Sequence, residues 1–342
     1  MNVFDLVASI SLDVSQYNSG LENAKHKMTL FGQGLAGTVG GIAGTLGKVA
    51  LSGVAAATTA VVAFGKSSLS VGMQFDQAMS GVAATLGKTV DEMNAEVLQG
   101  ADGWTGTLRE FAQKLGSETA FTATQAAQAL NYMALAGYTA QQSVDMLPTV
   151  LNLASAGGMD LARASDMVTD AQSALGLSFE DTTGLVNKMA LAASKTNTSV
   201  EQLGDAILTV GGTAKNMSGG TTELVEVLGL LADNGIKGSE GGTHLRNMLL
   251  KLASPTKDGT KALQALNLSI FDADGNMRSF SDIFQDMNAA LSQFTQEERL
   301  KMISDMFNAR DIASVEALLG TSAERWAELE VIGKLQDIIY IK

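Results

Sequence analysis

Residues 81–89, GVAATLGKT, resemble the phosphate loop of a nucleotide-binding protein. That loop requires a glycine, four further residues and then Gly-Lys-Ser or Gly-Lys-Thr, so that backbone amides surround the phosphates. Here five residues separate Gly81 from Gly87, and Val82 stands where the pattern requires glycine. A phosphate loop also follows a buried strand, whereas the apolar residues around this stretch recur with helical spacing. We therefore predict that residues 81–89 lie in a helix and bind no nucleotide.

A second stretch, DADGN at residues 272–276, resembles the start of a calcium-binding loop. Asp272, Asp274 and Asn276 alternate as the oxygen ligands of such loops do. A calcium loop, however, has glycine as its sixth residue and a glutamate at the twelfth that binds through both oxygens. Here the glycine is the fourth residue and the twelfth is Ile283. We therefore predict the turn of a small β-hairpin rather than a metal site.

The remaining chemically active residue types do not form a catalytic pattern. The two histidines, His26 and His244, lie far apart in the sequence, and no GxSxG or HExxH motif accompanies them. Paired carboxylates such as Glu297 and Glu298 fall at helix starts or on solvent-facing positions. The absence of cysteine excludes disulfides and thiolate metal sites. We expect no catalytic, cofactor-binding or metal-binding residues, and no enzyme activity.

The composition favours helices that pack through small side chains. Of the 342 residues, 36 are glycine and only two are proline, and aromatic residues make up 5%. The net charge is −13, and residues 1–66 contain four lysines and three acidic residues, so the negative charge lies in the remainder. An acidic surface repels phosphate groups, which argues against specific nucleic-acid recognition and against attraction to anionic lipid.

The first residues predict a strand–helix unit. Apolar residues alternate along residues 3–12, which indicates a short strand, and Asp13 or Ser15 can cap a following helix. We assign residues 1–31 to this unit. The same stretch contains Asp5 and no early basic residue, so it does not form a secretory signal and we expect synthesis in the cytoplasm.

Residues 32–65 form a glycine- and alanine-rich apolar segment whose single charge is Lys48. Aliphatic residues recur in it at helical spacing, and glycines follow the same rhythm on another face. Gly37 and Gly41 form a GxxxG pair, which lets two helix backbones approach closely. The residues that we expect to serve helix packing or membrane insertion are Leu35, Gly37, Val39, Gly40, Gly41, Ile42, Gly44, Leu46 and Gly47.

This segment requires a partner if it is a helix. Each glycine costs a helix in water about 1 kcal/mol relative to alanine. The partner is either another copy of the segment or a membrane, since the uncharged run reaches the lower edge of a membrane span. A flexible linker is the alternative that the composition leaves open.

The rest of the chain predicts helices. Residues 66–118 keep a helical pattern, and residues 119–254 repeat a unit of one short helix closed by a turn. Pro148 should kink its helix or begin the second half of its unit. Residues 255–342 add the predicted β-turn and further amphipathic helices. Three unit starts have the spacing of a capping box: Thr122 with Gln125, Thr139 with Gln142, and Thr198 with Glu201.

The predicted fold class is mainly α. It comprises a short N-terminal strand, a long glycine- and alanine-rich helical segment, and an array of short antiparallel helix pairs with one small β-hairpin. Helices this short cannot bury an apolar stripe alone, so neighbouring units must stack on one another.

Several motifs, in order along the chain, resemble the core of phage tail tape measure proteins. The first similarity lies in the predicted N-terminal strand and the residues up to Ala24. The most specific one begins at Leu115-Gly116 and continues through residues 125–137. The motifs are FDQAMSGVAA at residues 75–84, QAAQALNYMALAG at 125–137, MLPTVLNLASAG at 146–157, FDADGNMRSFSDI at 271–283 and MFNARDIASVEALLG at 306–320.

The resemblance implies a structural role in the virion. Tape measure proteins line the inside of the tail tube in a few copies, for which three-fold symmetry is expected, and they set the tail length. They leave ahead of the DNA and meet the host membrane. The implied partners are further copies of the chain, tail tube and tail tip proteins, tail assembly chaperones and the host membrane. The implied locations are the tail interior, the host cytoplasm during assembly and the host membrane during DNA delivery.

Family members continue as long helices beyond the region that ends here near Trp326. We therefore expect a truncated, split or prophage-derived gene, whose capacity to measure a tail is reduced. The alternative interpretation is a membrane-active protein that inserts residues 32–65 into a bilayer. A helical-repeat adaptor of the host cell is a third interpretation.

Overall fold

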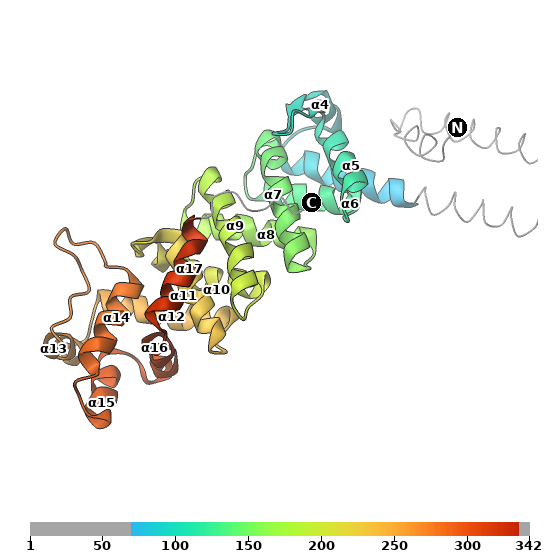
Figure 1. Cartoon of the computed structure of the whole chain (residues 1–342). Helices are drawn as coiled ribbons and strands as arrows, with labels where there is room; N and C mark the ends of the chain where they lie inside the picture. Colours follow the sequence, from blue (N-terminus) through green and yellow to red (C-terminus); the bar gives the residue numbers. More distant parts are fainter. Residues whose placement is uncertain (1–69, 335–342) are drawn as a thin grey trace, which may run out of the picture. The chain divides into compact units, whose positions relative to one another are not determined.

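The computed structural model describes residues 70–334 (Figure 1). The predicted strand–helix unit of residues 1–31 lies outside the described residues, and so does the segment of residues 32–65 with all nine of its expected packing residues. The chain divides into two units, Met1–Ser80 and Gly81–Lys342. Of the first unit the structure describes residues 70–80, which are helical. The rest of the account concerns the second unit.

The described chain is mainly α-helical, which confirms the predicted fold class. Its helices in the second unit after residues 81–85 are α4 (Val90–Ala95), α5 (Leu108–Glu118), α6 (Ala123–Leu135), α7 (Ala140–Gly157), α8 (Leu161–Leu175), α9 (Phe179–Lys195), α10 (Val200–Val210), α11 (Gly220–Asp233), α12 (Gly238–Ala253), α13 (Lys257–Ala265), α14 (Phe280–Leu291), α15 (Gln296–Met306), α16 (Ile312–Leu319) and α17 (Ala323–Lys334), with the 3₁₀ turns η1 (Gly211–Asn216) and η2 (Ala309–Asp311).

The predicted helix through residues 81–89 is correct only for its first half. Residues 81–85 are helical, and Gly87 then adopts a positive φ of 69°, which glycine tolerates at the end of a helix. Thr89 caps α4, and its side chain and that of Glu92 form a capping box. The GKT sequence therefore joins the end of one helix to the start of the next. It does not follow a strand, as a phosphate loop does.

The predicted repeat units of residues 119–254 correspond to α6 through α12. The capping boxes at Thr122 and Thr139 are confirmed. The third was placed one residue too early, because Ser199 is the cap of α10 and pairs with Gln202. Two hydroxyl residues stand side by side there, and the capping spacing alone does not choose between them. Pro148 does not begin a new helix, since α7 continues through it.

The most extensive helix contacts join α10 with α12 and α6 with α8, which are two apart in the sequence. Small residues allow these approaches. The Ser165 hydroxyl on α8 donates to the Ala129 carbonyl on α6 at 2.9 Å. Gly242 on α12 faces α10 so closely that a Cβ there would lie 2.3 Å from the Ala206 carbonyl oxygen. Glycine and alanine thus set the spacing between the helices of the array.

The described β-structure differs from the prediction. A two-stranded antiparallel sheet pairs β1 (Leu98–Gln99) with β2 (Thr105–Gly106), inside the region predicted to be helical throughout. Its turn is an Asp-Gly turn, in which the Asp102 carboxylate accepts a hydrogen bond from the Trp104 amide at 3.0 Å. The hairpin predicted near residues 266–280 is reduced to one antiparallel bridge, Phe271 with Met277.

The last described helix returns to the middle of the array. α17 packs on α9 and α11, as Figure 1 shows. The contact joins distant parts of the sequence, since Arg325 on α17 and Asp233 on α11 are 92 residues apart. The buried residues of α17 include Trp326, Leu329 and Ile332. Among the described helices, none has the length and apolarity that crossing a membrane would need.

Candidate functional site

His244 acquires a partner that the sequence pattern did not reveal. It lies on α12, and its Nδ1 is 2.6 Å from Oδ1 of Asp311 in η2. The amides of Asn247 and Asn308 donate to the same carboxylate at 3.1 and 2.9 Å. Asp311 is fully buried, His244 and Asn247 are half-buried, and Asn308 is exposed.

A histidine oriented by a carboxylate is part of a catalytic triad, which also needs a nucleophile beside the other ring nitrogen. Here His244 Nε2 lies 3.9 Å from a carboxylate oxygen of Glu240, which cannot act as a hydroxyl or thiol nucleophile. The group instead joins α12 to the start of α16. Asn308 and Asp311 come from one short stretch, but no local sequence pattern connects them with His244, which is 67 residues from Asp311.

The loop around Asp272 is a turn, as predicted. Oδ1 of Asp272 accepts hydrogen bonds from the backbone amides of Asn276 at 2.8 Å and Asp274 at 2.9 Å. The Asn276 amide is the main cause that holds the pKa of the Asp272 carboxyl below its usual range. The carboxylate therefore stabilises the turn. Within residues 70–334, no group of three or more histidine, aspartate or glutamate residues lies together so that it could hold a metal ion.

A second buried carboxylate joins two helix starts. Glu223 on α11 accepts a hydrogen bond from the Phe280 amide of α14 at 2.5 Å and another from the Gly219 amide at 3.0 Å. Burial raises the pKa of Glu223 although these two bonds favour its charged form. Like Asp311, it satisfies backbone or side-chain donors between elements that are distant in the sequence.

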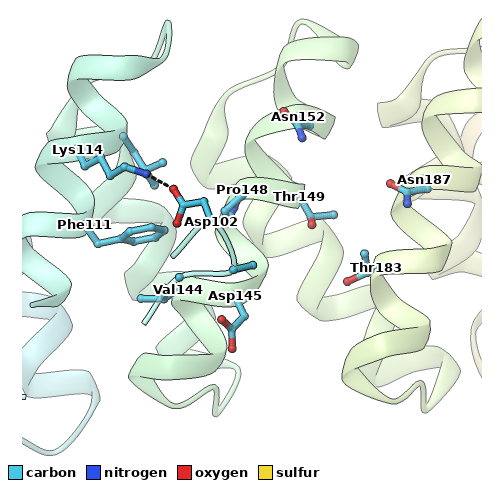
Figure 2. Close-up of a pocket in the computed structure, with 13 residues that line it drawn as sticks. Asp102, Phe111, Lys114, Val144, Asp145, Pro148, Thr149, Asn152, Thr183 and Asn187 are labelled. Atoms are coloured by element: carbon cyan, nitrogen blue, oxygen red, sulfur yellow. Dashed lines mark hydrogen bonds and ion pairs between the residues drawn. The ribbon is translucent and has the colours of Figure 1, made fainter. Parts of the chain in front are cut away.

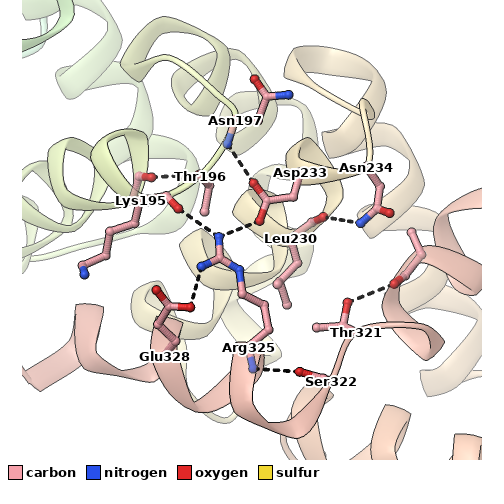
Figure 3. A network of polar contacts seen from close by, with 12 residues as sticks. Lys195, Thr196, Asn197, Leu230, Asp233, Asn234, Thr321, Ser322, Arg325 and Glu328 are labelled. Atoms are coloured by element: carbon pink, nitrogen blue, oxygen red, sulfur yellow. Dashed lines mark hydrogen bonds and ion pairs between the residues drawn. The ribbon is translucent and has the colours of Figure 1, made fainter.

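Arg325 fastens α17 to the ends of two helices (Figure 3). Its Nη2 donates to the Asp233 carboxylate at 2.7 Å and to the Lys195 carbonyl at 2.9 Å. The Asp233 carboxylate also accepts a hydrogen bond from the Asn197 amide at 2.8 Å. The last carbonyls of a helix lack internal partners, so an arginine is well placed at the C-terminal end of α9.

Replacing Arg325 with methionine should lower the free energy of unfolding by about 1–2 kcal/mol, since a charged donor is lost by both acceptors. Methionine keeps much of the apolar stem, so the change reports mainly on the polar contacts. Urea unfolding would measure it. As a control, Glu328→Ala removes only the 2.8 Å pair with Arg325 on the exposed side of the helix and should cost less than about 0.5 kcal/mol. Equal losses in both variants would show that the clamp does not stabilise α17.

A groove of about 460 Å³ lies where α5, α7 and α9 approach the hairpin loop (Figure 2). At its rim, Lys114 on α5 forms an ion pair with Asp102 of the loop, with 2.5 Å between Nζ and Oδ2. Gln141 at the start of α7 holds the hairpin, because its side-chain amide donates to the Gln99 carbonyl at 2.6 Å and its carbonyl accepts from the Gln99 amide at 3.2 Å.

The floor of the groove is formed by one face of α7, and its far wall by α9. Thr149 and Asn152 on α7 and Thr183 and Asn187 on α9 project into the space between the two helices (Figure 2). The groove therefore combines apolar side chains such as Phe111 and Leu115 with neutral amides and hydroxyls on α7 and α9, and it has carboxylates near the hairpin. This set can bind other molecules through hydrogen bonds. It contains no activated nucleophile.

Comparison with known proteins places these features in a family. Residues 109–308 match the model of a family described as phage-related minor tail protein. The chain is 30% identical over 327 residues, or 95% of its length, to the tape measure protein of Pneumococcus phage Dp-1. It is 29% identical over 287 residues, or 82% of its length, to the probable tape measure protein of Escherichia phage P2.

The chain spans only part of these relatives, 27% of the Dp-1 protein and 33% of the P2 protein. No solved structure matches it. The matched residues 109–308 include the helix array from α6 to α12 and the helical walls of the groove. The hairpin loop and Asp311 lie just outside the matched range. The resemblance to tape measure proteins is confirmed, and the chain belongs to the phage-related minor tail protein family.

Proposed function

We propose that this chain is the core of a tape measure protein, a structural component of the phage tail rather than an enzyme. The observation that carries the proposal is the match over 95% of the chain to a tape measure protein. The described residues support it physically, because polar groups, of which Asp311 and Glu223 are buried, join helices to one another. Asp311, Glu223 and Asp233 each accept donors from more than one element.

In this proposal the chain assembles inside the tail tube in a few copies with three-fold symmetry. It contacts tail tube and tail tip proteins and receives help from tail assembly chaperones in the host cytoplasm. It contributes to tail length and assists DNA delivery. The acidic composition, with a net charge of −13, supports passage beside DNA without specific recognition of its sequence.

The direct test is the composition and length of tails. Particles from a phage that encodes the chain should contain it by mass spectrometry, and deletion of its coding sequence should abolish tails of normal length. Complementation with the intact sequence should restore them. Tails of normal length that form without the chain would contradict the proposal.

The membrane alternative depends on residues 32–65, which lie outside the described residues. It predicts that the intact protein releases dye from liposomes and that deletion of residues 32–65 abolishes the release. Release that is unchanged by the deletion would remove this segment as the cause.

A further inference from the structure

Unused hydrogen-bonding groups line the groove between α7 and α9. Within residues 70–334, the side-chain amides of Asn152 and Asn187 form no hydrogen bond, and both project into the groove (Figure 2). Thr149 lies one turn before Asn152 on α7, and Thr183 lies one turn before Asn187 on α9. The two helices therefore present the same pair of residue types to a shared space, a threonine and an asparagine that are three residues apart on α7 and four apart on α9.

The charge of the groove selects a cationic occupant. Asp145 on α7 is exposed, and within the described residues its carboxylate accepts one hydrogen bond, from Gln141 at 3.0 Å. The one lysine in the lining, Lys114, already faces two carboxylates, Asp102 at 2.5 Å and Glu118 at 3.4 Å. Among the charged residues of the lining, Asp145 is therefore the carboxylate that Lys114 does not pair with, and its charge favours an ammonium or guanidinium group over phosphate.

We propose that this groove binds an extended segment of a partner protein that carries lysine or arginine. A side-chain amide offers one carbonyl acceptor and an NH₂ donor, so Asn152 and Asn187 can each pair with a peptide group of the segment. The basic side chain lies toward the exposed carboxylate of Asp145. A volume of about 460 Å³ is in the usual range of binding pockets. This inference goes beyond the tail assignment, because it concerns binding by the isolated chain and does not require that the chain measure a tail.

The test uses the purified full chain and a fluorescein-labelled eight-residue peptide of alternating alanine and lysine. Fluorescence anisotropy should show binding of this peptide and none of the matching alanine–glutamate peptide. The double variant Asn152→Leu, Asn187→Leu should weaken binding about tenfold, since two hydrogen-bonded pairs are lost. Asp145→Asn should weaken it about threefold, as expected for an exposed charge pair.

Two controls separate the groove from general attraction of a cation to an acidic chain. Asp274→Asn removes the same charge from an exposed turn and should leave affinity within about twofold, because long-range charge is screened by salt. Thermal unfolding of every variant shows whether the helices remain intact. Binding that the asparagine variants do not change, equal binding of the glutamate peptide, or an equal loss in Asp274→Asn would overturn the proposal.

Discussion

Replacing Asp311 with alanine should lower the free energy of unfolding by about 3–5 kcal/mol, because a buried carboxylate and its three hydrogen bonds are lost. The Asp311 carboxylate is fully buried and accepts hydrogen bonds from three side chains, His244, Asn247 and Asn308. Alanine leaves all three donors without their acceptor, and two of them belong to α12. Urea unfolding, followed by circular dichroism at the helical band, would measure the loss.

Asp305→Ala is the matched control for this change. Asp305 is on α15 and pairs with Lys301 at 3.0 Å, and the Lys301 side chain is 73% exposed. Such a surface pair contributes less than about 1 kcal/mol, so the control should remain close to the unaltered protein. Asp311→Asn keeps the shape and one acceptor oxygen, and its loss should fall between the two. If Asp311→Ala were no less stable than Asp305→Ala, the buried group would not hold α12 to α16.

The helices of the array could be predicted because their signals are local. The helices from α6 to α10 begin with a polar side-chain cap, and all the helices from α6 to α12 carry buried apolar residues. Both features depend only on residues within or next to one helix. The error at Ser199 shows the limit of that reasoning, because two adjacent hydroxyls fit the same spacing. The small sheet was missed because strands of two residues carry no periodicity, although its Asp102-Gly103 turn is a recognised hairpin signal.

The polar groups that join distant elements could not be predicted from the sequence. His244 and Asp311 are 67 residues apart, and Arg325 and Lys195 are 130 apart. Their pairing depends on how the helices stack, which no local pattern specifies. The groove was missed for the same reason, since its walls come from separate helices and the hairpin loop. The glycine positions at helix contacts were likewise hidden, because glycine at a close contact and glycine on an open face look alike in a sequence.

Gly242→Ala tests this last point, and we expect it to lower the free energy of unfolding by about 2–3 kcal/mol. A Cβ at this position would lie 2.3 Å from the Ala206 carbonyl oxygen and 2.8 Å from the Thr209 Cβ on α10. The first of these is a backbone atom, which can yield only if the two helices move apart. That displacement outweighs the gain of about 1 kcal/mol that alanine brings to a helix interior. Chemical unfolding of the purified chain would measure the difference.

Two other helical glycines complete the series. Gly184 on α9 has open space where a Cβ would lie, so Gly184→Ala should stabilise the protein by up to about 1 kcal/mol. A Cβ added at Gly204 on α10 would lie 1.8 Å from the sulfur of Met167. A methionine side chain can rearrange, so Gly204→Ala should cost less than Gly242→Ala. The expected order of stability is therefore Gly184→Ala, Gly204→Ala and then Gly242→Ala. If Gly242→Ala were as stable as Gly184→Ala, close backbone contact would not be what spaces α10 and α12.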